Sequence, residues 1–116
     1  MNASITLTVK NDNYKDTVIV KNIKNKDSFS YVDNENMKCH VDIFDDGLNL
    51  YRENNEYKLE LHLRKESYAK IINDQGELKI NTKVVDFNRN NDILVMRYII
   101  ELDDERFIEI RYEGDK

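Results

Sequence analysis

The side chains best able to do chemistry are few: one cysteine, two histidines, and acidic residues gathered near turns. Cys39 and His40 are adjacent, so on a strand they point to opposite faces and cannot form a thiolate–imidazole pair. Zinc needs three or four ligands, and this cysteine with His40 and His62 does not complete such a set. The run Asp42–Gly47 lacks the ligand spacing of a calcium loop and is typical of a hairpin turn. We therefore expect no enzyme activity, no catalytic residue, no metal site and no cofactor.

Amphipathic side chains that lie among apolar ones are the candidates for binding. Tyr57 leads the leucine face of its segment, and Tyr98 shares the alternating face of Leu94 and Leu102. A tyrosine ring fits an apolar interior while its hydroxyl needs a partner, so inward hydroxyls can orient a ligand. The predicted ligand-binding residues are Tyr57, Tyr98, Arg97 and Arg111. The alternatives stay open that each tyrosine ends at the rim of the fold and that the stem of Arg97 covers apolar surface.

The elements that must position these residues are strands. Leu59, Leu61 and Leu63 alternate with polar residues, and a strand sends successive side chains to opposite faces. The same alternation predicts about ten strands and no helix. The predicted strands are Ser4–Lys10, Lys15–Asn22, a short one at Phe29 and Tyr31, Met37–Ile43, Leu48–Arg52, Glu56–Arg64, Ser67–Ile72, Leu78–Phe87, Ile93–Leu102 and Arg106–Glu113.

Tight turns between long strands favour an antiparallel meander. Asp45-Asp46-Gly47 and Asn54-Asn55 are turn signals between alternating segments. Closing the sheet removes edges that would otherwise aggregate. We predict one domain, residues 1–116, that is all-β and forms a single meander β-barrel of about 8–10 strands. An interior of this size is filled by side chains or holds one small ligand.

Composition and charge exclude several classes of protein. The net charge of −5 and the pI of about 5.0 oppose a nucleic-acid binder, which normally carries a basic face. No stretch approaches the roughly 20 apolar residues of a membrane span, and we see no signal peptide. A single cysteine excludes an internal disulfide. The sequence therefore predicts a soluble cytoplasmic protein without a nucleic-acid or membrane partner.

The second half of the chain resembles the YwiB-like family of small bacterial proteins. The matching features span residues 40–112 and are Gly47-x-x-Leu50-Tyr51, the segment Gly76-Glu77-Leu78-x-Ile80 leading to Thr82-Lys83, and Tyr98 ahead of the IELDDE turn. The resemblance implies a calycin-like, lipocalin-type β-barrel. It implies no catalytic residues and no assigned function, so small-molecule binding follows by analogy of fold alone.

Two functions compete at this stage. The first is a binding module whose barrel interior holds a small, mostly apolar or amphipathic ligand. The alternative is a protein–protein interaction module with a solid core. Its motivation is the strand Ile93–Leu102, which is apolar on both faces, so its outer face would need a cover from a partner or from a second copy in a homodimer.

Overall fold

Strands occupy nearly the whole chain, as the alternation predicts. The structure is a computed structural model in which residues 3–101 and 105–114 are described. The strands are β1 (Ser4–Lys10), β2 (Lys15–Lys21), β3 (Ser28–Val32), β4 (Lys38–Phe44), β5 (Gly47–Glu53), β6 (Tyr57–Leu63), β7 (Ser67–Asn73), β8 (Gly76–Arg89), β9 (Ile93–Ile100) and β10 (Glu105–Glu113). The predicted end of the ninth strand, Leu102, lies outside the described residues. Within the described part of the chain, no helix is long and apolar enough to cross a membrane.

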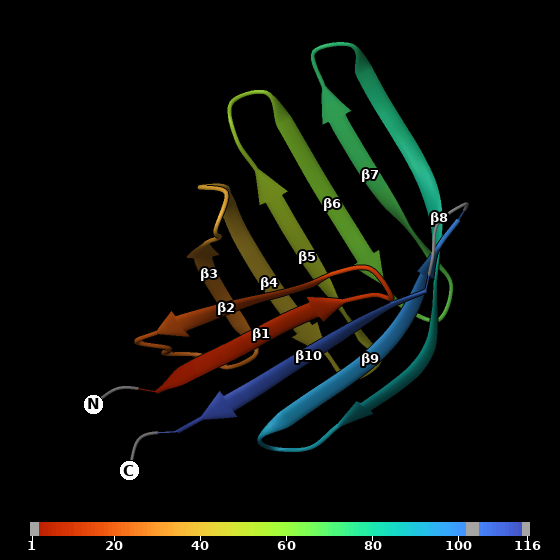
Figure 1. Ribbon diagram of the computed structural model, residues 1–116. Helices are drawn as coiled ribbons and strands as arrows, with labels where there is room; N and C mark the ends of the chain where they lie inside the picture. Colours follow the sequence, from red (N-terminus) through yellow and green to blue (C-terminus); the bar gives the residue numbers. More distant parts are fainter. Residues whose placement is uncertain (1–2, 102–104, 115–116) are drawn as a thin grey trace.

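The ten strands form one antiparallel sheet that nearly closes into a barrel. Its order is β2-β1-β10-β9-β8-β7-β6-β5-β4-β3, so strands adjacent in sequence are paired everywhere except between β2 and β3. The first and last strands of the chain pair one strand in from the β2 edge of the sheet, where Leu7 on β1 is registered with Ile110 on β10. Figure 1 shows two crossing layers, one containing β3–β7 and the other β9, β10, β1 and β2. The predicted all-β barrel of about ten antiparallel strands is confirmed.

Strand β8 joins the two layers. It is 14 residues long and carries a register shift between Val84 and Asp86, where Val85 is the extra residue. A bulge of this kind bends a strand and increases its twist. Val84 packs inward on one side of the bulge and Phe87 packs inward on the other, so the bulge also keeps both on the core face.

Asparagine and aspartate side chains fix the turns. The Asn11 side-chain oxygen accepts the backbone N–H groups of Asn13 and Tyr14, and the Asn54 oxygen accepts that of Glu56. The same contact recurs at Asn25, Asp33, Asn73 and Asn90. Such a side chain mimics a backbone turn, which explains why these residues separate the strands.

The core consists of the side chains at every second position of the strands, which face inward. Its largest fully buried side chains include Tyr98, Ile5, Leu48, Leu63, Met96 and Ile108. The three leucines of β6 differ in burial: Leu61 and Leu63 are buried, whereas Leu59 is only half-buried. The core therefore occupies one end of the β5–β6 hairpin, and the other end extends past it.

Candidate functional site

A cavity of about 550 Å³ opens at the end of the barrel that carries the β1–β2 and β3–β4 turns. We call it the mouth cavity. It is lined by Leu7, Val9, Tyr14, Lys15, Asp16, Val18, Tyr31, Asp33, Asn34, Glu35, Cys39, Leu50, Arg52, Leu59, Leu61, Tyr98, Arg106 and Ile108. The apolar wall comes from inward positions of β1, β2, β5, β6 and β10, and the polar groups gather on the rim. Three of the lining residues are basic and three are acidic, so their formal charges balance.

Arg52 organises the polar side of the mouth cavity. Its Nε donates to the Asp33 carboxylate at 2.6 Å and its Nη2 donates to the Glu35 carboxylate at 2.7 Å. Arg52 lies on β5 on the same face as Leu50, whereas both acids belong to the β3–β4 turn. The guanidinium therefore holds this turn against β5 at the edge of the cavity.

The Asp33 carboxylate is the most enclosed charge at this rim, with a side chain that is 9% exposed. Burial alone would raise its pKa, but this effect is outweighed by the backbone N–H groups of Met37 and Glu35 and by the Arg52 guanidinium, which together hold the pKa of Asp33 below its usual value. Burial likewise disfavours the charged form of Arg52, and its two acidic partners reverse that effect and raise its pKa. Both groups are therefore ionised at neutral pH.

Tyr31 and Cys39 form a neutral pair beside this ion pair. They are registered across β3 and β4, and both line the mouth cavity. Burial, followed by the neighbouring Asp33 carboxylate, raises the pKa of the Cys39 thiol to about 11. Burial and the adjacent Cys39 raise the pKa of Tyr31 as well. The cavity thus presents a protonated phenol and a protonated thiol, which are hydrogen-bonding groups rather than nucleophiles.

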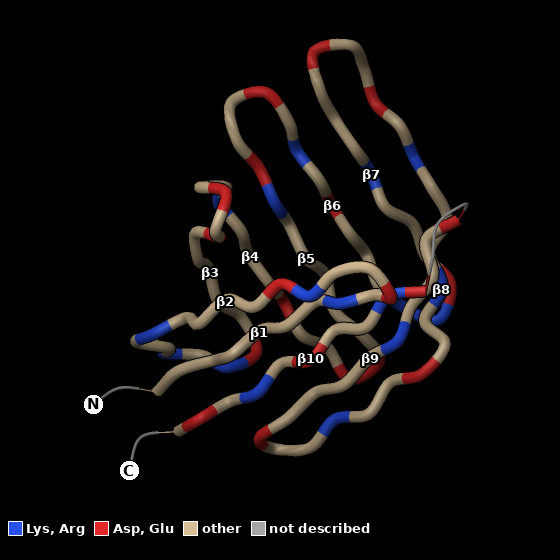
Figure 2. The backbone as a smooth tube through the Cα atoms, viewed as in Figure 1, with Lys and Arg blue, Asp and Glu red and all other residues tan. Residues whose placement is uncertain are grey.

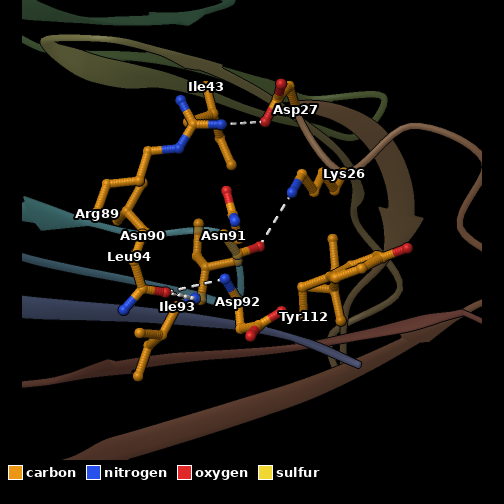
Figure 3. Close-up of a pocket in the computed structure, with 12 residues that line it drawn as sticks. Lys26, Asp27, Ile43, Arg89, Asn90, Asn91, Asp92, Ile93, Leu94 and Tyr112 are labelled. Carbon is orange, nitrogen blue, oxygen red and sulfur yellow. Dashed lines mark hydrogen bonds and ion pairs between the residues drawn. The ribbon is translucent and has the colours of Figure 1, made fainter. Parts of the chain in front are cut away.

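The opposite end of the barrel is closed. Figure 3 shows Arg89, from the end of β8, directed at Asp27 in the β2–β3 loop, with which it forms an ion pair. Arg89 also donates to the Phe44 carbonyl at 3.3 Å, and Lys26 donates to the Asn91 carbonyl at 3.0 Å. The space left among these residues is about 20 Å³, which is room for about one water molecule. The larger opening of the barrel is therefore the mouth cavity at its other end.

The structure places only one of the four predicted ligand residues in the mouth cavity. Tyr98 is buried there, registered across from Arg106. Tyr57 lines a separate hollow between the tips of the β5–β6 and β7–β8 hairpins. Arg97 and Arg111 lie exposed on the outer face, where Arg97 is paired with Asp86 and Glu105 and Arg111 with Glu109. The structure therefore does not bring the four residues together in the interior.

Two arginines that the sequence prediction missed line the mouth cavity instead. Arg52 follows Leu48 and Leu50 at alternate positions, and Arg106 precedes Ile108 and Ile110 in the same way. An arginine on an otherwise apolar face was therefore the available signal. The sequence carries no such signal for the β3–β4 turn, which supplies polar side chains to the rim of the cavity, because turn residues follow no alternation.

A second polar constellation lies on the outer face of β3 and β4. The Ser30 hydroxyl is 2.6 Å from His40 Nδ1, and His40 Nε2 is 2.9 Å from the Asp42 carboxylate. Ser28 donates to the same carboxylate at 2.7 Å, and Ser28 and His40 together lower the pKa of Asp42. In this order, an imidazole can accept the hydroxyl proton while the carboxylate orients the ring. None of these residues lines the mouth cavity. Across the described residues, no three potential metal ligands come together.

The outer face of β9 carries both apolar and charged groups. Ile99 is exposed on β9 opposite Lys83, and Val85, the bulge residue of the neighbouring strand β8, is also exposed. Arg97 lies between flanking acids on the same face. Figure 2 shows basic and acidic residues interspersed along the strands. This face is therefore apolar only in a small patch.

Comparisons with known proteins add little to this geometry. No protein-family model matches the chain, and no curated protein matches it. A solved structure that is similar is the crystal structure of the YwiB protein from Bacillus subtilis, with 14% identity, a TM-score of 0.46, and coverage of 99% of this chain and 91% of that chain. Membership of the YwiB-like family and the calycin-like assignment stay predictions.

Proposed function

We propose that this protein is a binding module that holds a small, mostly apolar molecule in the mouth cavity. The observation that supports this function is the cavity itself, whose volume of about 550 Å³ falls within the usual range of ligand sites, roughly 300–1,000 Å³. Its deep wall is aliphatic, so burial of an apolar ligand there is favourable at about 25 cal/mol per Å² of apolar surface.

The polar rim defines the other end of such a ligand. Tyr31 supplies a hydrogen-bonding hydroxyl, and the charge of Arg52 is neutralised by Asp33 and Glu35. A rim of balanced charge favours a ligand with a neutral or weakly charged polar group over a multiply charged one. We therefore propose an amphipathic ligand whose apolar body lies deep and whose polar group stays at the rim.

The test uses the neutral fluorescent probe N-phenyl-1-naphthylamine. We expect its fluorescence to rise saturably with one probe bound per chain. Val18→Phe fills the cavity from β2 and is expected to weaken probe binding at least tenfold, while Val95→Phe on the outer face of β9 serves as the matched control. Equal binding by both variants, or no saturable binding by the native chain, would refute the function.

A second candidate function is self-association through the outer face of β9. The exposed apolar side chain of Ile99 favours it, together with exposed Val85 on the adjoining strand β8, because apolar side chains on a surface are a frequent contact between copies. Light scattering after size exclusion is expected to show a dimer that Ile99→Asp converts to a monomer. A native chain that is monomeric at high concentration would exclude this function.

A further inference from the structure

Among the residues that the structure describes, the sheet has two free edges, β2 and β3, and the β2 edge carries backbone groups with no neighbouring strand. The β1–β2 turn is closed by a hydrogen bond from Asn11 N–H to the Tyr14 carbonyl. Hydrogen-bonded and non-hydrogen-bonded pairs alternate along an antiparallel ladder. Counting from this turn, the backbone groups of Lys15, Thr17, Ile19 and Lys21 point away from β1.

A side-chain contact shows that this edge accepts a donor from outside the ladder. The Asn34 amide, from the β3–β4 turn, donates to the Thr17 carbonyl at 3.3 Å and to the Asp16 carboxylate at 3.1 Å. An amide N–H here takes the place that a backbone N–H of another strand would take. The β2 edge is therefore only partly satisfied within the described chain.

An apolar surface extends from the same opening. Leu59 lines the mouth cavity together with residues of β2. Leu59 is paired across strands with Ile71 on β7, and Ile71 is paired with Leu78 on β8, so the three side chains lie in one row. We call Leu59, Ile71 and Leu78 the apolar shelf. Ile71 is half-buried and Leu78 is 57% exposed, although both lie on the inward side of the sheet. In Figure 1 the β5–β6 and β7–β8 hairpins extend beyond β2, which leaves this inner side without a facing layer there.

We propose that the free edge of β2 pairs with an extended peptide segment of another protein, and that the peptide's alternate apolar side chains cover the apolar shelf. Strand addition of this kind takes its affinity from backbone hydrogen bonds and its specificity from alternate side chains. Every second side chain of the added strand points inward toward the shelf.

The charges of β2 define the outward side chains of the partner. Lys15 and Lys21 flank Thr17 and Ile19 on the exposed side of the strand, and all four are exposed. Opposite charges across paired strands are favourable and like charges are not. The partner segment therefore has acidic residues at both ends and small or apolar residues between them.

The same lysines disfavour a second copy of this chain at the edge. An antiparallel β2–β2 pair centred on Val18 places Lys15 directly opposite Lys21 of the other copy, twice. Terminal lysines are a common device against such self-pairing. An acidic peptide turns the same two charges into favourable contacts.

The probe is a capped heptapeptide with glutamate at both ends, valine at positions two, four and six, and threonine at positions three and five. We expect saturable binding by calorimetry and slowed hydrogen exchange at the amides of Thr17 and Ile19. A peptide with lysine in place of both glutamates is expected to bind at least tenfold more weakly.

Two variants with matched controls locate the site. Ile19→Pro removes an N–H on the free edge without breaking the β1–β2 ladder, and should weaken peptide binding at least tenfold. Val32→Pro is the control, because Val32 has a similar exposure (59% against 61%), and its N–H points to the other free edge, on β3. Leu78→Asp should weaken binding through the shelf, while Val85→Asp, also exposed but on the outer face, should not.

Peptide binding that survives both Ile19→Pro and Leu78→Asp overturns this inference, as does unchanged exchange at the two amides. Protection of those amides without peptide, rising with protein concentration, would instead identify a second copy and also overturn it. Binding of N-phenyl-1-naphthylamine by Ile19→Pro should stay unchanged, because Ile19 does not line the mouth cavity. The failure of one function can therefore be told from the failure of the other.

Discussion

The contact between Arg52 and Asp33 joins the β3–β4 turn to β5 through a nearly enclosed carboxylate. Replacing Arg52 by Met keeps much of the side-chain length but removes the partner of that carboxylate, which costs more than losing an exposed pair. We expect Arg52→Met to lower the free energy of unfolding by about 1–3 kcal/mol at neutral pH. Urea denaturation monitored by circular dichroism measures this change.

Arg97→Met is the control for this change. Its ion pairs are longer than 3.5 Å and exposed, so their loss should lower the free energy of unfolding by only about 0–0.5 kcal/mol.

The pH dependence of the Arg52→Met effect follows from the lowered pKa of Asp33. A carboxylate with a depressed folded-state pKa stabilises the fold above its unfolded pKa, and this stability is lost as the pH falls through the folded value. The difference in the free energy of unfolding between the native and Arg52→Met proteins should therefore shrink as the pH falls. A difference that stays constant in acid would contradict the role assigned to the Asp33 carboxylate.

Cys39 is the chain's single thiol and reports on the mouth cavity. Only a thiolate is alkylated readily, and a pKa of about 11 leaves very little thiolate at neutral pH. We expect iodoacetamide to react at least tenfold more slowly with the folded protein than with the chain in urea. The folded-state rate should keep rising toward pH 11, and a plateau near pH 9 would contradict the burial of this thiol.

At the scale of elements, the bulge at Val85 lets one strand serve both layers. Deleting Val85 leaves Val84 and Phe87 on the inward face but makes the β8–β9 ladder regular, which removes the local bend. We expect the deletion to lower the free energy of unfolding by about 3 kcal/mol. Val85→Ala, which keeps the extra residue, should change it by less than about 0.5 kcal/mol. Thermal unfolding of the two variants gives the comparison, and similar stabilities would mean that the bend depends on other residues.

The strands themselves could be predicted because each has one buried face. Leu59, Leu61 and Leu63 show directly which positions of β6 face inward, and the Asn and Asp turns mark where strands end. The bulge could not be predicted from the same pattern. Leu78, Ile80, Thr82 and Val84 alternate regularly, and the extra outward residue before Phe87 is the apolar Val85, so residue type does not reveal that it points outward.

The site could be predicted only in part. The alternation of side chains along β9 correctly places Tyr98 inside and Arg97 outside, because adjacent residues of a strand face opposite sides. It does not say which side chains reach one cavity, since this depends on the sheet order and on the layers crossing. Arg52 meets Asp33 only because β3, β4 and β5 are neighbours and the turn folds over the rim. The sequence separation of these residues carries no such information.

At the scale of the whole molecule, Arg89 links three segments at the closed end: β8, the β2–β3 loop and the end of β4. Arg89→Met removes both the ion pair with Asp27 and the bond to the Phe44 carbonyl. We expect a loss of about 1–2 kcal/mol in the free energy of unfolding. Arg111→Met removes only an exposed contact with Glu109 and should cost under about 0.5 kcal/mol. Chemical denaturation with guanidinium compares them, and equal losses would show that Arg89 does not lock this end.

The pairing of β1 with β10 has a consequence for how the chain is made. Leu7 meets Ile110 only after roughly a hundred further residues have left the ribosome. Until then β1 lacks the strand that joins it to β9, so its second edge is unpaired, and an isolated two-stranded hairpin is marginally stable in water. A pause in translation before the last strand is therefore expected to lengthen the time during which β1 has an unpaired edge that can associate with other chains.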